Sequence, residues 1–477
     1  MIRTGELASK FQRNGSEPMT DHPEAVGNLV WRRTVHSRQM VLAQRWFFCF
    51  PKALFFDCHA QERGLCDAAE GTQERLRPMT RFSMSWAGPY QYEIGKSPDK
   101  QEKPPEVIFD EQVPTLLCLS HLRWSFVYQR PQHLMSRFAR DFNLLFCEEP
   151  IPTEDDQPWL EVRPEENGVQ VLVPRLPHGC EGETALRVQR DLLDGYLSKL
   201  GVNELMLWFY TPMALDYAGH LEPSLIVYDC MDELSAFRGA PPELVERERE
   251  LLKRADLVFT GGYSIWEAKR ELHDNAHAFP SSVDVAHFAE ARRTQADPAD
   301  QSEIPHPRLG FYGVIDERFD IELVAEVAKQ RPDWQFVLVG PVVKIDPADL
   351  PQRDNIHYLG GKTYDELPKY LSGWDVAIMP FAMNESTRFI SPTKTPEYLA
   401  GGCPVVSTPI KDVVRTYGDT EIVYIADTPD AFIASVDKAL ADGEDRDRLL
   451  RLADEILGDM SWDHTWALMK EKMKCAK

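Results

Sequence analysis

The sequence predicts an α/β protein made of two consecutive doubly wound domains, each with a parallel sheet covered by helices on both faces. After about residue 112, short apolar runs alternate with helical patterns, which is typical of parallel strands buried on both faces. The polar, proline-bearing stretch "AEARRTQADPADQSEIPHPR" interrupts this alternation at residues 289–308, and a second alternating series follows it. Such a break predicts an interdomain linker.

The first series begins at "TLLCLSHLRW", where Thr115 to Leu119 form a continuous apolar run. In "RPQHLMSRFARDF", Leu134, Phe138 and Phe142 share one face of a predicted helix. A second, charged amphipathic helix is expected in "ELVERERELLKRAD". Further strands are expected in "NLLFCEEP", "VQVLVP", "ELMLWFY", "SLIVYDC" and "LVFTGG".

The second series repeats this alternation and ends in an amphipathic helix, "SWDHTWALMKEKM", which we expect to pack back across the domain junction. Its strands are expected in "RLGFYGVI", "WQFVLVGP", "NIHYLGG", "DVAIMPF", "PVVST" and "TEIVYIAD". The predicted boundaries are 112–290 and 308–455 for the two domains, 291–307 for the linker and 456–477 for the last helix.

Residues 1–111 show neither helical nor strand periodicity and end in the charged, proline-bearing stretch "KSPDKQEKPPEVIFDEQVP". A segment that cannot bury enough apolar surface does not offset the entropy of ordering its chain. We therefore expect an N-terminal extension and linker that are largely disordered and dispensable for folding. Met79 and Met84 are alternative positions for the start of translation.

Composition excludes several classes of function. The formal net charge is −23 at pH 7, which argues against a nucleic-acid partner, since such binding needs a basic surface. Nine cysteines occur without a C-x-x-C pair, and histidines do not recur at metal-ligand spacing. The nearest candidate for a membrane span, "WFFCFPKALFF", is shorter than the roughly 20 residues that cross a bilayer and contains Pro51 and Lys52. A cytoplasmic protein without a metal site is predicted.

Ligands of open parallel sheets bind at the carboxyl ends of the strands, and two loops there are rich in glycine. "GFYGVIDERFD" carries Gly313, which lets backbone approach a ligand closely, and Arg318, which suits a phosphate. "NIHYLGGKTYDELPKY" carries Gly360 and Gly361 before a helix, where exposed backbone groups suit a base edge. The alternatives are ordinary strand–helix packing in the first loop and a tight turn with a threonine cap in the second.

The stretch "ISPTKTPEYLAGGCPVVSTP" predicts a helix start with an unusual set of side chains. We expect Ser391 as N-cap and Pro392 at the first helical position. Thr393 and Lys394 then lie at the helix entry, and Glu397 follows one turn later on the same face as Lys394. A lysine there opposes the helix dipole unless an anion is bound. A nucleotide diphosphate fits, with its ribose against Glu397; a solvated Lys394–Glu397 pair is the alternative.

The loop "PFAMNESTRF" follows the preceding predicted strand and is densely polar. Asn384 and Glu385 lie in it, where the part of a ligand beyond its phosphates would be held. A solvated loop without a ligand is the alternative.

At this point the sequence resembles a known family. "TKTPEYLAGGCPVVST" resembles the donor-binding motif of GT-B glycosyltransferases of the kind named glycosyl transferases group 1. In the first half, "LSHLRWSFVYQRPQHLMSRFA" and "VYDCMDELSAF" resemble a bacterial subgroup that builds cell-surface polysaccharides. The resemblance implies two Rossmann-like domains facing a cleft, with the donor held by the C-terminal one.

The resemblance also implies the substrates. A nucleotide sugar, with UDP or GDP as nucleotide, would donate a sugar to a glycan or lipid-linked acceptor, with no other cofactor. Peripheral association with the inner face of the membrane would accompany a lipid-linked acceptor.

Residue roles implied by the resemblance divide between the halves. Glu397 falls on the second, ribose-binding glutamate of the E-x7-E motif, whereas the first falls on Phe389, so that Asn384 or Glu385 would substitute for it. Asp232, or less favourably Asp229, would serve as general base if the anomeric centre inverts, and would position the acceptor if it does not. The acceptor side would also include His121, Arg123 and Trp124.

Two other functions fit the same residues. A UDP-sugar 2-epimerase-type isomerase would share the fold. A catalytically silent sugar-binding partner is suggested by Phe389 at the position of the first glutamate.

Overall fold

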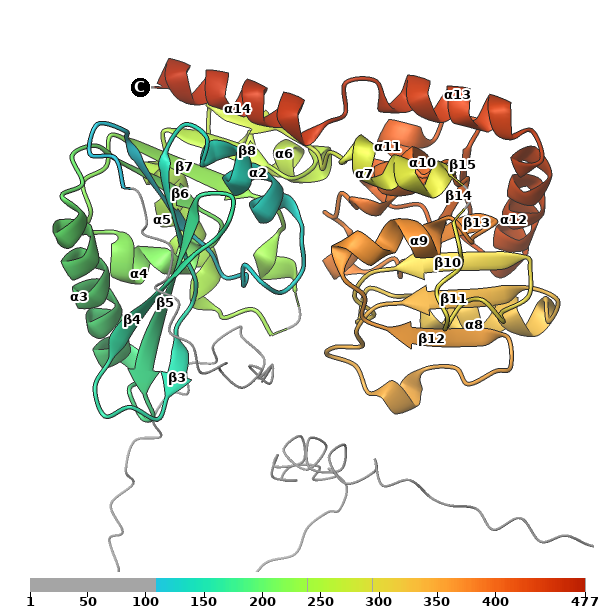
Figure 1. Cartoon of the computed structure of the whole chain (residues 1–477), viewed down its shortest axis with the longest axis horizontal. Helices are drawn as coiled ribbons and strands as arrows, with labels where there is room; N and C mark the ends of the chain where they lie inside the picture. The colour runs from blue at the N-terminus through green and yellow to red at the C-terminus, as the bar shows by residue number, and fades with distance from the viewer. Residues whose placement is uncertain (1–108, 238, 294, 477) are drawn as a thin grey trace, which may run out of the picture. The chain divides into compact units, whose positions relative to one another are not determined.

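The computed structural model describes residues 109–476 with the exception of 238 and 294 (Figure 1). All of these residues belong to one compact unit, Thr80–Lys477. The predicted N-terminal extension lies outside the described residues, apart from its last three positions, and so do Met79 and Met84.

The first half of the described chain forms a nine-stranded sheet in the order β3-β5-β2-β1-β6-β7-β8-β9, with β4 paired to β5. All pairs along this path are parallel, and only β4 runs antiparallel to its neighbour. Every predicted strand of this half is present. The bounds are β1 Thr115–Leu119, β2 Asn143–Cys147, β3 Ile151–Thr153, β4 Trp159–Pro164, β5 Val169–Pro177, β6 Leu205–Phe209, β7 Leu225–Cys230, β8 Leu257–Thr260 and β9 Ala276–Ala278.

Helices cover both faces of this sheet, as the apolar runs predict. One buried cluster lies between one face and helix α2, and a second lies between the other face and helices α3 and α5. The bounds are α2 Arg130–Phe138, α3 Gly182–Leu200, α4 Leu215–Ala218, α5 Glu243–Arg254, α6 Tyr263–Lys269 and α7 Val285–Phe288, with 3-10 turns η2 Pro212–Ala214, η3 Leu234–Ala236 and η4 Ala289–Arg292.

The second half forms a six-stranded parallel sheet in the order β12-β11-β10-β13-β14-β15. Numbered along the chain, this is the order 3-2-1-4-5-6 of a doubly wound nucleotide-binding fold. The predicted strands are again all present. The bounds are β10 Arg308–Tyr312, β11 Gln335–Val339, β12 Ile356–Gly360, β13 Val376–Met379, β14 Val405–Ser407 and β15 Val423–Ile425.

The helices of the second half enclose one continuous core. Several begin at side-chain caps that the sequence supplies: Asp320 accepts from Leu323 N at the start of α8, and Thr428 accepts from Ala431 N at the start of α12. The bounds are α8 Ile321–Gln330, α9 Leu367–Leu371, α10 Lys394–Ala400, α11 Lys411–Tyr417, α12 Pro429–Gly443, α13 Arg446–Leu457 and α14 Trp462–Ala476, with η5 Pro347–Asp349, η6 Tyr364–Glu366 and η7 Glu385–Thr387.

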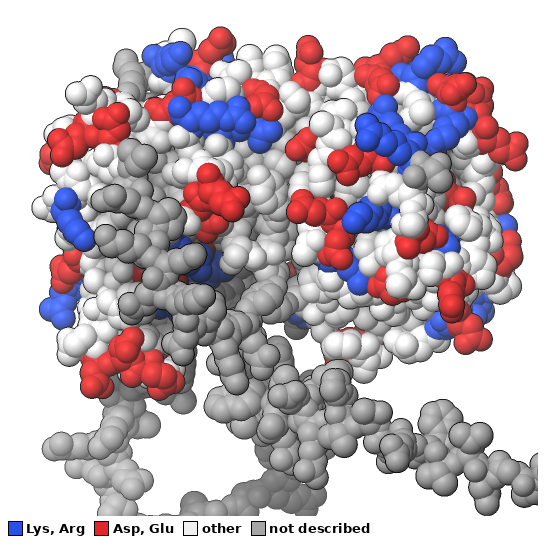
Figure 2. Space-filling model, in the orientation of Figure 1, with Lys and Arg blue, Asp and Glu red and all other residues white. Residues whose placement is uncertain are grey.

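The last helix, α14, leaves the second sheet and packs on α2 of the first (Figure 1). Trp462, Met469 and Met473 belong to the buried cluster of the first sheet. Basic and acidic side chains are interspersed along this edge of the molecule (Figure 2), where Arg137 and Arg140 both pair with Asp463. The chain therefore crosses between the two sheets twice, once through the linker and once before α14.

A second contact joins the two halves where α6 meets α11. The backbone N–H of Ser264 donates to Asp412 at 3.0 Å. Glu267 accepts from Lys411 at 2.6 Å and from Arg415 at 2.8 Å.

Among the described residues, no helix is both long and apolar enough to span a bilayer.

Candidate functional site

The order of each sheet reverses once, and these reversals fix where a ligand can enter. In the second sheet the reversal lies between β10 and β13, so the loops that follow these two strands diverge at its carboxyl edge. In the first sheet it lies between β1 and β6. The polar loops singled out in the sequence are those that follow β10, β12, β13, β1 and β7.

Gly313 and Lys394 meet at the reversal of the second sheet. A Cβ at Gly313 would meet the end of the Lys394 side chain, and the φ of +139° at this position favours glycine. Gly340, after β11, packs directly on the Gly313 carbonyl in the same way. The Lys394 ammonium lies 5.8 Å from the ring centres of Phe311 and Phe381, within cation–π range. Burial lowers the pKa of Lys394, and nearby Glu397 opposes that shift.

The helix that carries this lysine begins later than the sequence suggests. The expected start, with Ser391 as N-cap and Pro392 at the first position, is wrong, because α10 begins at Lys394 and Thr393 is its N-cap. Pro396 explains the difference. A helix beginning at Pro392 would place Pro396 in its interior, where its missing N–H breaks the ladder. Beginning at Lys394, the helix places Pro396 in the first turn, where no N–H partner is needed.

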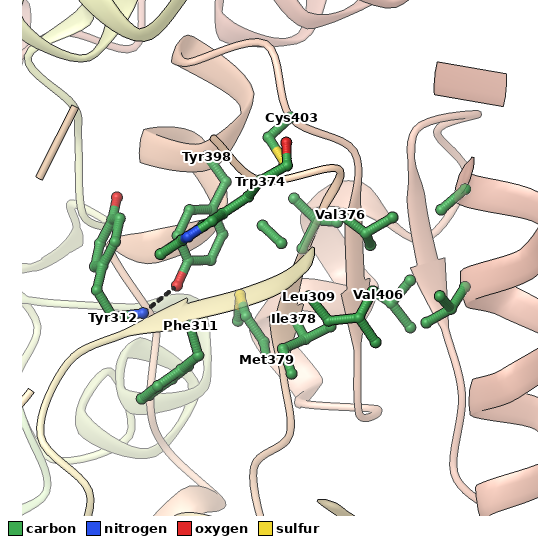
Figure 3. Close-up of a cluster of buried hydrophobic side chains, with 14 of the residues drawn as sticks. Leu309, Phe311, Tyr312, Trp374, Val376, Ile378, Met379, Tyr398, Cys403 and Val406 are labelled. Carbon is green, nitrogen blue, oxygen red and sulfur yellow. Dashed lines mark hydrogen bonds between the residues drawn. The ribbon is translucent and has the colours of Figure 1, made fainter. Parts of the chain in front are cut away.

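Glu397 is a half-buried carboxyl beside three polar neighbours. Burial raises its pKa to about 7, and Lys394, Tyr312 and Thr393 favour the ionised form. Tyr312 is the last residue of β10, and its backbone N–H donates to Tyr398 OH at 3.1 Å (Figure 3). The Tyr312 ring packs on that of Tyr398 at 4.7 Å between ring centres, and its buried hydroxyl lies within electrostatic range of Glu397. A proton acceptor at this position suits a ligand that offers hydroxyl groups.

Arg318 lies on the loop after β10 and is held by Asp316. Its Nε donates to Asp316 at 2.9 Å, and its terminal nitrogen donates to the same carboxylate at 2.7 Å. Its guanidinium also lies 5.5 Å from the ring centre of Phe237, a residue of the first sheet's domain. Arg318 therefore faces the other half of the molecule from the carboxyl edge of β10.

Asp232 lies opposite Arg318, on the loop after β7. Burial raises the pKa of Asp232, while the charges of Arg318, Arg130 and Lys344 oppose that shift. Of the two candidate general bases, Asp232 was preferred to Asp229 from the sequence. The surroundings of the two carboxylates differ in the structure. Asp229 is fully buried and accepts three hydrogen bonds from Arg130, at 2.8, 3.0 and 3.2 Å. Asp229 is therefore occupied, whereas Asp232 is turned toward cations of the other domain.

A buried lysine holds the loop that carries Asp232. Lys269 pairs with Glu233 and with Glu248, each at 2.7 Å, and its side chain is only 4% exposed. Tyr228 donates to the same Glu248 at 2.7 Å. These contacts fix the residue next to Asp232, so the position of its carboxylate is set by the fold.

The three residues predicted on the acceptor side occupy different environments. Trp124 is buried in the core against Phe146, at 5.0 Å between ring centres. Arg123 donates to Glu148 at 3.1 Å and to backbone carbonyls that follow β2. Both side chains are therefore held by contacts within the first domain. His121 retains a buried Nδ1 without a hydrogen-bond partner, and burial lowers its pKa to about 4.

Asn384 and Glu385 begin the turn η7 after β13. The Asn384 side chain accepts from Ser386 N and Thr387 N and donates to the Glu317 carbonyl at 3.1 Å, so it joins the loops after β13 and β10. Glu385 is 78% exposed and lies 3.6 Å from Arg388. The structure therefore brings Asn384, but not the Glu385 side chain, into the hydrogen-bonded part of the edge.

Phe389 packs against the buried cluster of the first domain. The residue at the position of the first motif glutamate is therefore an interdomain contact, and it offers no polar group to a ligand. The backbone agrees, since Ser281 Oγ donates to the nearby Ser391 carbonyl at 3.3 Å.

Gly360 and Gly361 are exposed at the carboxyl end of β12. Thr363 and Glu366 form the capping box that a tight turn with a threonine cap requires, with Thr363 N donating to Glu366 at 2.9 Å. The next residue, Tyr364, stacks on His287 at 4.2 Å between ring centres, and its hydroxyl is buried without a partner. Burial and the nearby charge of Glu397 raise the pKa of this tyrosine.

Three residues that the sequence reading missed stand out. Lys344 follows β11 and acts on Asp232. Tyr312 ends β10 beside Glu397. Glu149 follows β2 with one carboxylate oxygen buried and unpartnered, and burial raises its pKa to about 7. Each follows or ends a strand at its carboxyl end, so extending the same rule to every predicted strand would have found them.

Within the part of the chain that the structure describes, no group of three or more His, Cys, Asp or Glu side chains is arranged to hold a metal ion. The polar groups gathered at the site are the cations Arg318, Lys344 and Lys394, the carboxylates Asp232 and Glu397, and tyrosine hydroxyls.

A known protein family and a known protein are each similar in sequence to a part of this chain. Residues 306–442, which span most of the second sheet's domain, match the family Glycosyl transferases group 1. The chain is 28% identical over 237 residues to TuaH of Bacillus subtilis (strain 168), which is assigned as a teichuronic acid biosynthesis glycosyltransferase. That match covers 46% of this chain and 59% of TuaH, so the chain spans less than two thirds of the relative's length.

Solved structures match over a larger part of the chain at low identity. Sucrose-phosphate synthase (tll1590) from Thermosynechococcus elongatus has a TM-score of 0.58 at 16% identity, covering 76% of this chain and 98% of that one. A trehalose-6-phosphate protein from E. coli bound with UDP-2-fluoro glucose has a TM-score of 0.56 at 12% identity, covering 76% and 99%. Anabaena Alr3699/HepE in complex with UDP and glucose has a TM-score of 0.51 at 12% identity, with the same coverage.

The structural matches concern the fold, and the sequence matches concern the family. Both are consistent with two doubly wound sheets whose polar loops lie at their carboxyl edges. The chain therefore has the GT-B fold, and its residues 306–442 match the family Glycosyl transferases group 1.

Proposed function

We propose that this protein is a glycosyltransferase that moves a sugar from a nucleotide-diphosphate sugar to a hydroxyl group of a glycan or lipid-linked acceptor in cell-surface polysaccharide synthesis. The observation that carries the proposal is the pairing of Lys394 and Glu397 one turn apart on α10, with Lys394 packed against Gly313. A cation beside closely approaching backbone suits a phosphate, and a half-buried carboxylate suits ribose hydroxyls.

The comparisons support the substrate classes. The family match covers the domain that carries this pair. One structural neighbour is bound with UDP-2-fluoro glucose, and another is in complex with UDP and glucose. TuaH is assigned to the synthesis of a cell-surface polymer. We therefore propose UDP or GDP as the donor nucleotide and a growing glycan or its lipid-linked precursor as the acceptor.

The proposed reaction exchanges one bond at the anomeric carbon for another. The acceptor oxygen attacks that carbon, the bond from the carbon to the β-phosphate oxygen breaks, and the nucleoside diphosphate leaves with the bonding electrons. The acceptor proton passes to Asp232 if the configuration inverts. Arg318 and Lys394 stabilise the charge that develops on the diphosphate, so the proposal involves no metal cofactor.

Replacing Lys394 by methionine is expected to weaken nucleoside diphosphate binding by about 1.5–3 kcal/mol, the range of a charge-assisted hydrogen bond. Methionine keeps an apolar stem between Phe311 and Phe381 and removes only the charge. Calorimetric titration with UDP and uridine, or with GDP and guanosine, checks this, because the nucleoside should lose much less affinity. Equal losses for both would indicate a structural role for Lys394, and Lys369→Met on α9, which is exposed, is the matched control.

Replacing Glu397 by glutamine is expected to raise KM for the donor and to remove a pH dependence. In the parent protein, nucleotide affinity should rise with pH through about 7, because only the ionised carboxylate accepts from two ribose hydroxyls. Titrations from about pH 6 to about pH 8 should show this rise in the parent and a flat profile in Glu397→Gln. A rise that persists in the variant would assign it to another group.

The same carboxyl makes a predictable contribution to stability. Its folded pKa of about 7 lies above its ordinary value of 4.5, so the folded state binds the proton more tightly than the unfolded state. Its contribution to the free energy of unfolding is therefore highest below about pH 4.5 and falls as the pH rises toward 7.

One experiment tests the proposed function against its two alternatives. The protein is incubated with a panel of UDP- and GDP-sugars, with and without glycan or lipid-linked acceptors, and free nucleotide and sugar products are measured. A glycosyltransferase releases nucleotide and forms a glycoside when acceptor is present. A 2-epimerase-type isomerase changes the sugar with no acceptor, and a silent binding partner shows affinity without turnover.

A further inference from the structure

Lys344 has an unusual backbone conformation at the carboxyl edge of the second sheet. Its φ is +62°, and it is the one non-glycine residue with positive φ among residues 109–476, leaving aside 238 and 294. Left-handed backbone is strained for a residue with a Cβ, and such strain gathers where a side chain must be aimed at a ligand. Glycine or asparagine would adopt this conformation more easily.

The Lys344 side chain reaches from its loop toward the first domain. It lies 5.2 Å from the ring centre of Phe237, the same ring that Arg318 approaches at 5.5 Å. Its charge acts on Asp232, which lies on the loop before Phe237. Lys344 and Arg318 therefore flank one aromatic ring and one carboxylate of the opposite domain.

Within its own domain, Lys344 forms a long ion pair with Glu317. Its ammonium lies 3.7 Å from Glu317, beyond the 2.7–2.9 Å of a charge-assisted hydrogen bond. The side chain is 41% exposed. A strained backbone position therefore carries a lysine whose half-exposed side chain reaches the aromatic ring of the opposite domain.

We propose that Lys344 is a further substrate-binding residue, which contacts the diphosphate of the donor together with Arg318 and Lys394. This inference rests on the proposed function. The strands that carry these cations place them around one point: Arg318 follows β10, Lys344 follows the neighbouring β11, and Lys394 packs on Gly313 between the two loops. In the absence of donor, the two outer cations face Asp232 and Phe237.

The proposed contact strengthens as the reaction proceeds. Negative charge on the β-phosphate grows while its bond to the anomeric carbon breaks, so a cation there stabilises the transition state more than the bound donor. Loss of Lys344 should therefore lower kcat as well as nucleoside diphosphate affinity. If Lys344 only supported its loop, replacing it would lower the stability of both domains. The affinities for nucleoside diphosphate and for nucleoside would then change by the same factor.

Lys344→Gly tests the proposal, because glycine removes the cation and relieves the backbone strain at once. The melting temperature should stay the same or rise. Affinity for UDP or GDP, whichever the parent binds, should fall about 10- to 100-fold, with little change for the corresponding nucleoside, and kcat should fall too. Lys344→Arg should retain most of the nucleoside diphosphate affinity and most of kcat. The matched control is Lys329→Ala, which replaces an exposed lysine on α8.

The outcomes separate this inference from the proposed function. A parent that binds nucleoside diphosphate and turns over a nucleotide sugar, together with a Lys344→Gly variant that does both equally well, overturns the role of Lys344 alone. A lower melting temperature with equal losses for nucleoside and diphosphate also overturns it, because that pattern marks a structural lysine. A parent that binds no nucleoside diphosphate overturns the proposed function and this inference with it.

Discussion

Asp232→Asn is expected to lower kcat by about 10²- to 10⁴-fold, the contribution of a general base. Affinity for the nucleoside diphosphate should stay unchanged or rise slightly. Both parts of the expectation follow from where the carboxylate lies. It follows β7 of the first domain, and the charges of Arg318 and Lys344 of the second act on it. We therefore expect it to compete with the donor phosphates for these cations and not to bind the donor.

The protonation behaviour of Asp232 agrees with this role. Burial raises its pKa, which makes the carboxylate a better proton acceptor than an exposed aspartate. In the parent protein, kcat/KM should therefore fall at acid pH as this group is protonated, and Asp232→Asn should lose that limb of the profile.

Stereochemistry decides which kinetic constant changes. If the product inverts the donor configuration, the loss in Asp232→Asn appears in kcat. If the configuration is retained, no strong base is required, and the loss appears in KM for the acceptor. NMR of the glycoside product distinguishes the two cases before the variant is examined.

Turnover and nucleotide titration on Asp232→Asn should be measured beside Glu222→Gln, an exposed carboxylate of the same domain. A variant that turns over like the parent, or that no longer binds nucleotide, contradicts the assignment. Glu149 then becomes the next candidate, since one of its oxygens is buried without a partner and burial raises its pKa to about 7.

The strands were predictable because their chemistry is local and redundant. Runs such as Thr115 to Leu119 are apolar at every position, and each is buried on both faces of a parallel sheet. β3 and β4 were missed for the opposite reason. In Trp159–Pro164 every residue is exposed or only partly buried, and the strand runs antiparallel at the sheet edge, where its half-polar pattern resembles a loop.

The candidate site was predictable only as far as single loops reveal it. Lys394 and Glu397 lie three residues apart, so their common face follows from helical spacing alone. The start of their helix was predicted wrongly. Ser391 and Pro392 favour an earlier start, which the second proline, Pro396, excludes because it would then lie in the helix interior. Lys344 was missed because the two observations that distinguish it are its positive φ and its contact with a ring of the other domain. Neither can be predicted from the sequence of its own loop.

Asp229 shows the same limit from the opposite side. "VYDCMDE" offers two carboxylates, and nothing within the motif states which one is paired. The partner, Arg130, is 99 residues away at the start of α2. The distinction between a structural and a candidate catalytic aspartate therefore depends on a contact between distant segments.

That contact supports the prediction with the largest expected effect on folding. Arg130→Met should lower the free energy of unfolding by about 3–5 kcal/mol, the cost of leaving one member of a buried ion pair without its partner. Asp229 is fully buried, and Arg130 is 2% exposed. Arg130 also donates to the Phe279 carbonyl at 2.7 Å, so its loss frees a second acceptor close to the domain junction.

The double variant Arg130→Met with Asp229→Leu should recover part of the loss, because neither charge then remains buried alone. Arg140→Met is the matched control. Arg140 pairs with Asp463 across a surface where both side chains are 57% exposed, so its removal should cost no more than about 1 kcal/mol. Urea unfolding followed by tryptophan fluorescence compares the three variants. If Arg130→Met unfolds at the same urea concentration as Arg140→Met, the pair does not hold the loop after β7, and the position of Asp232 must be set by Lys269 and Glu233 alone.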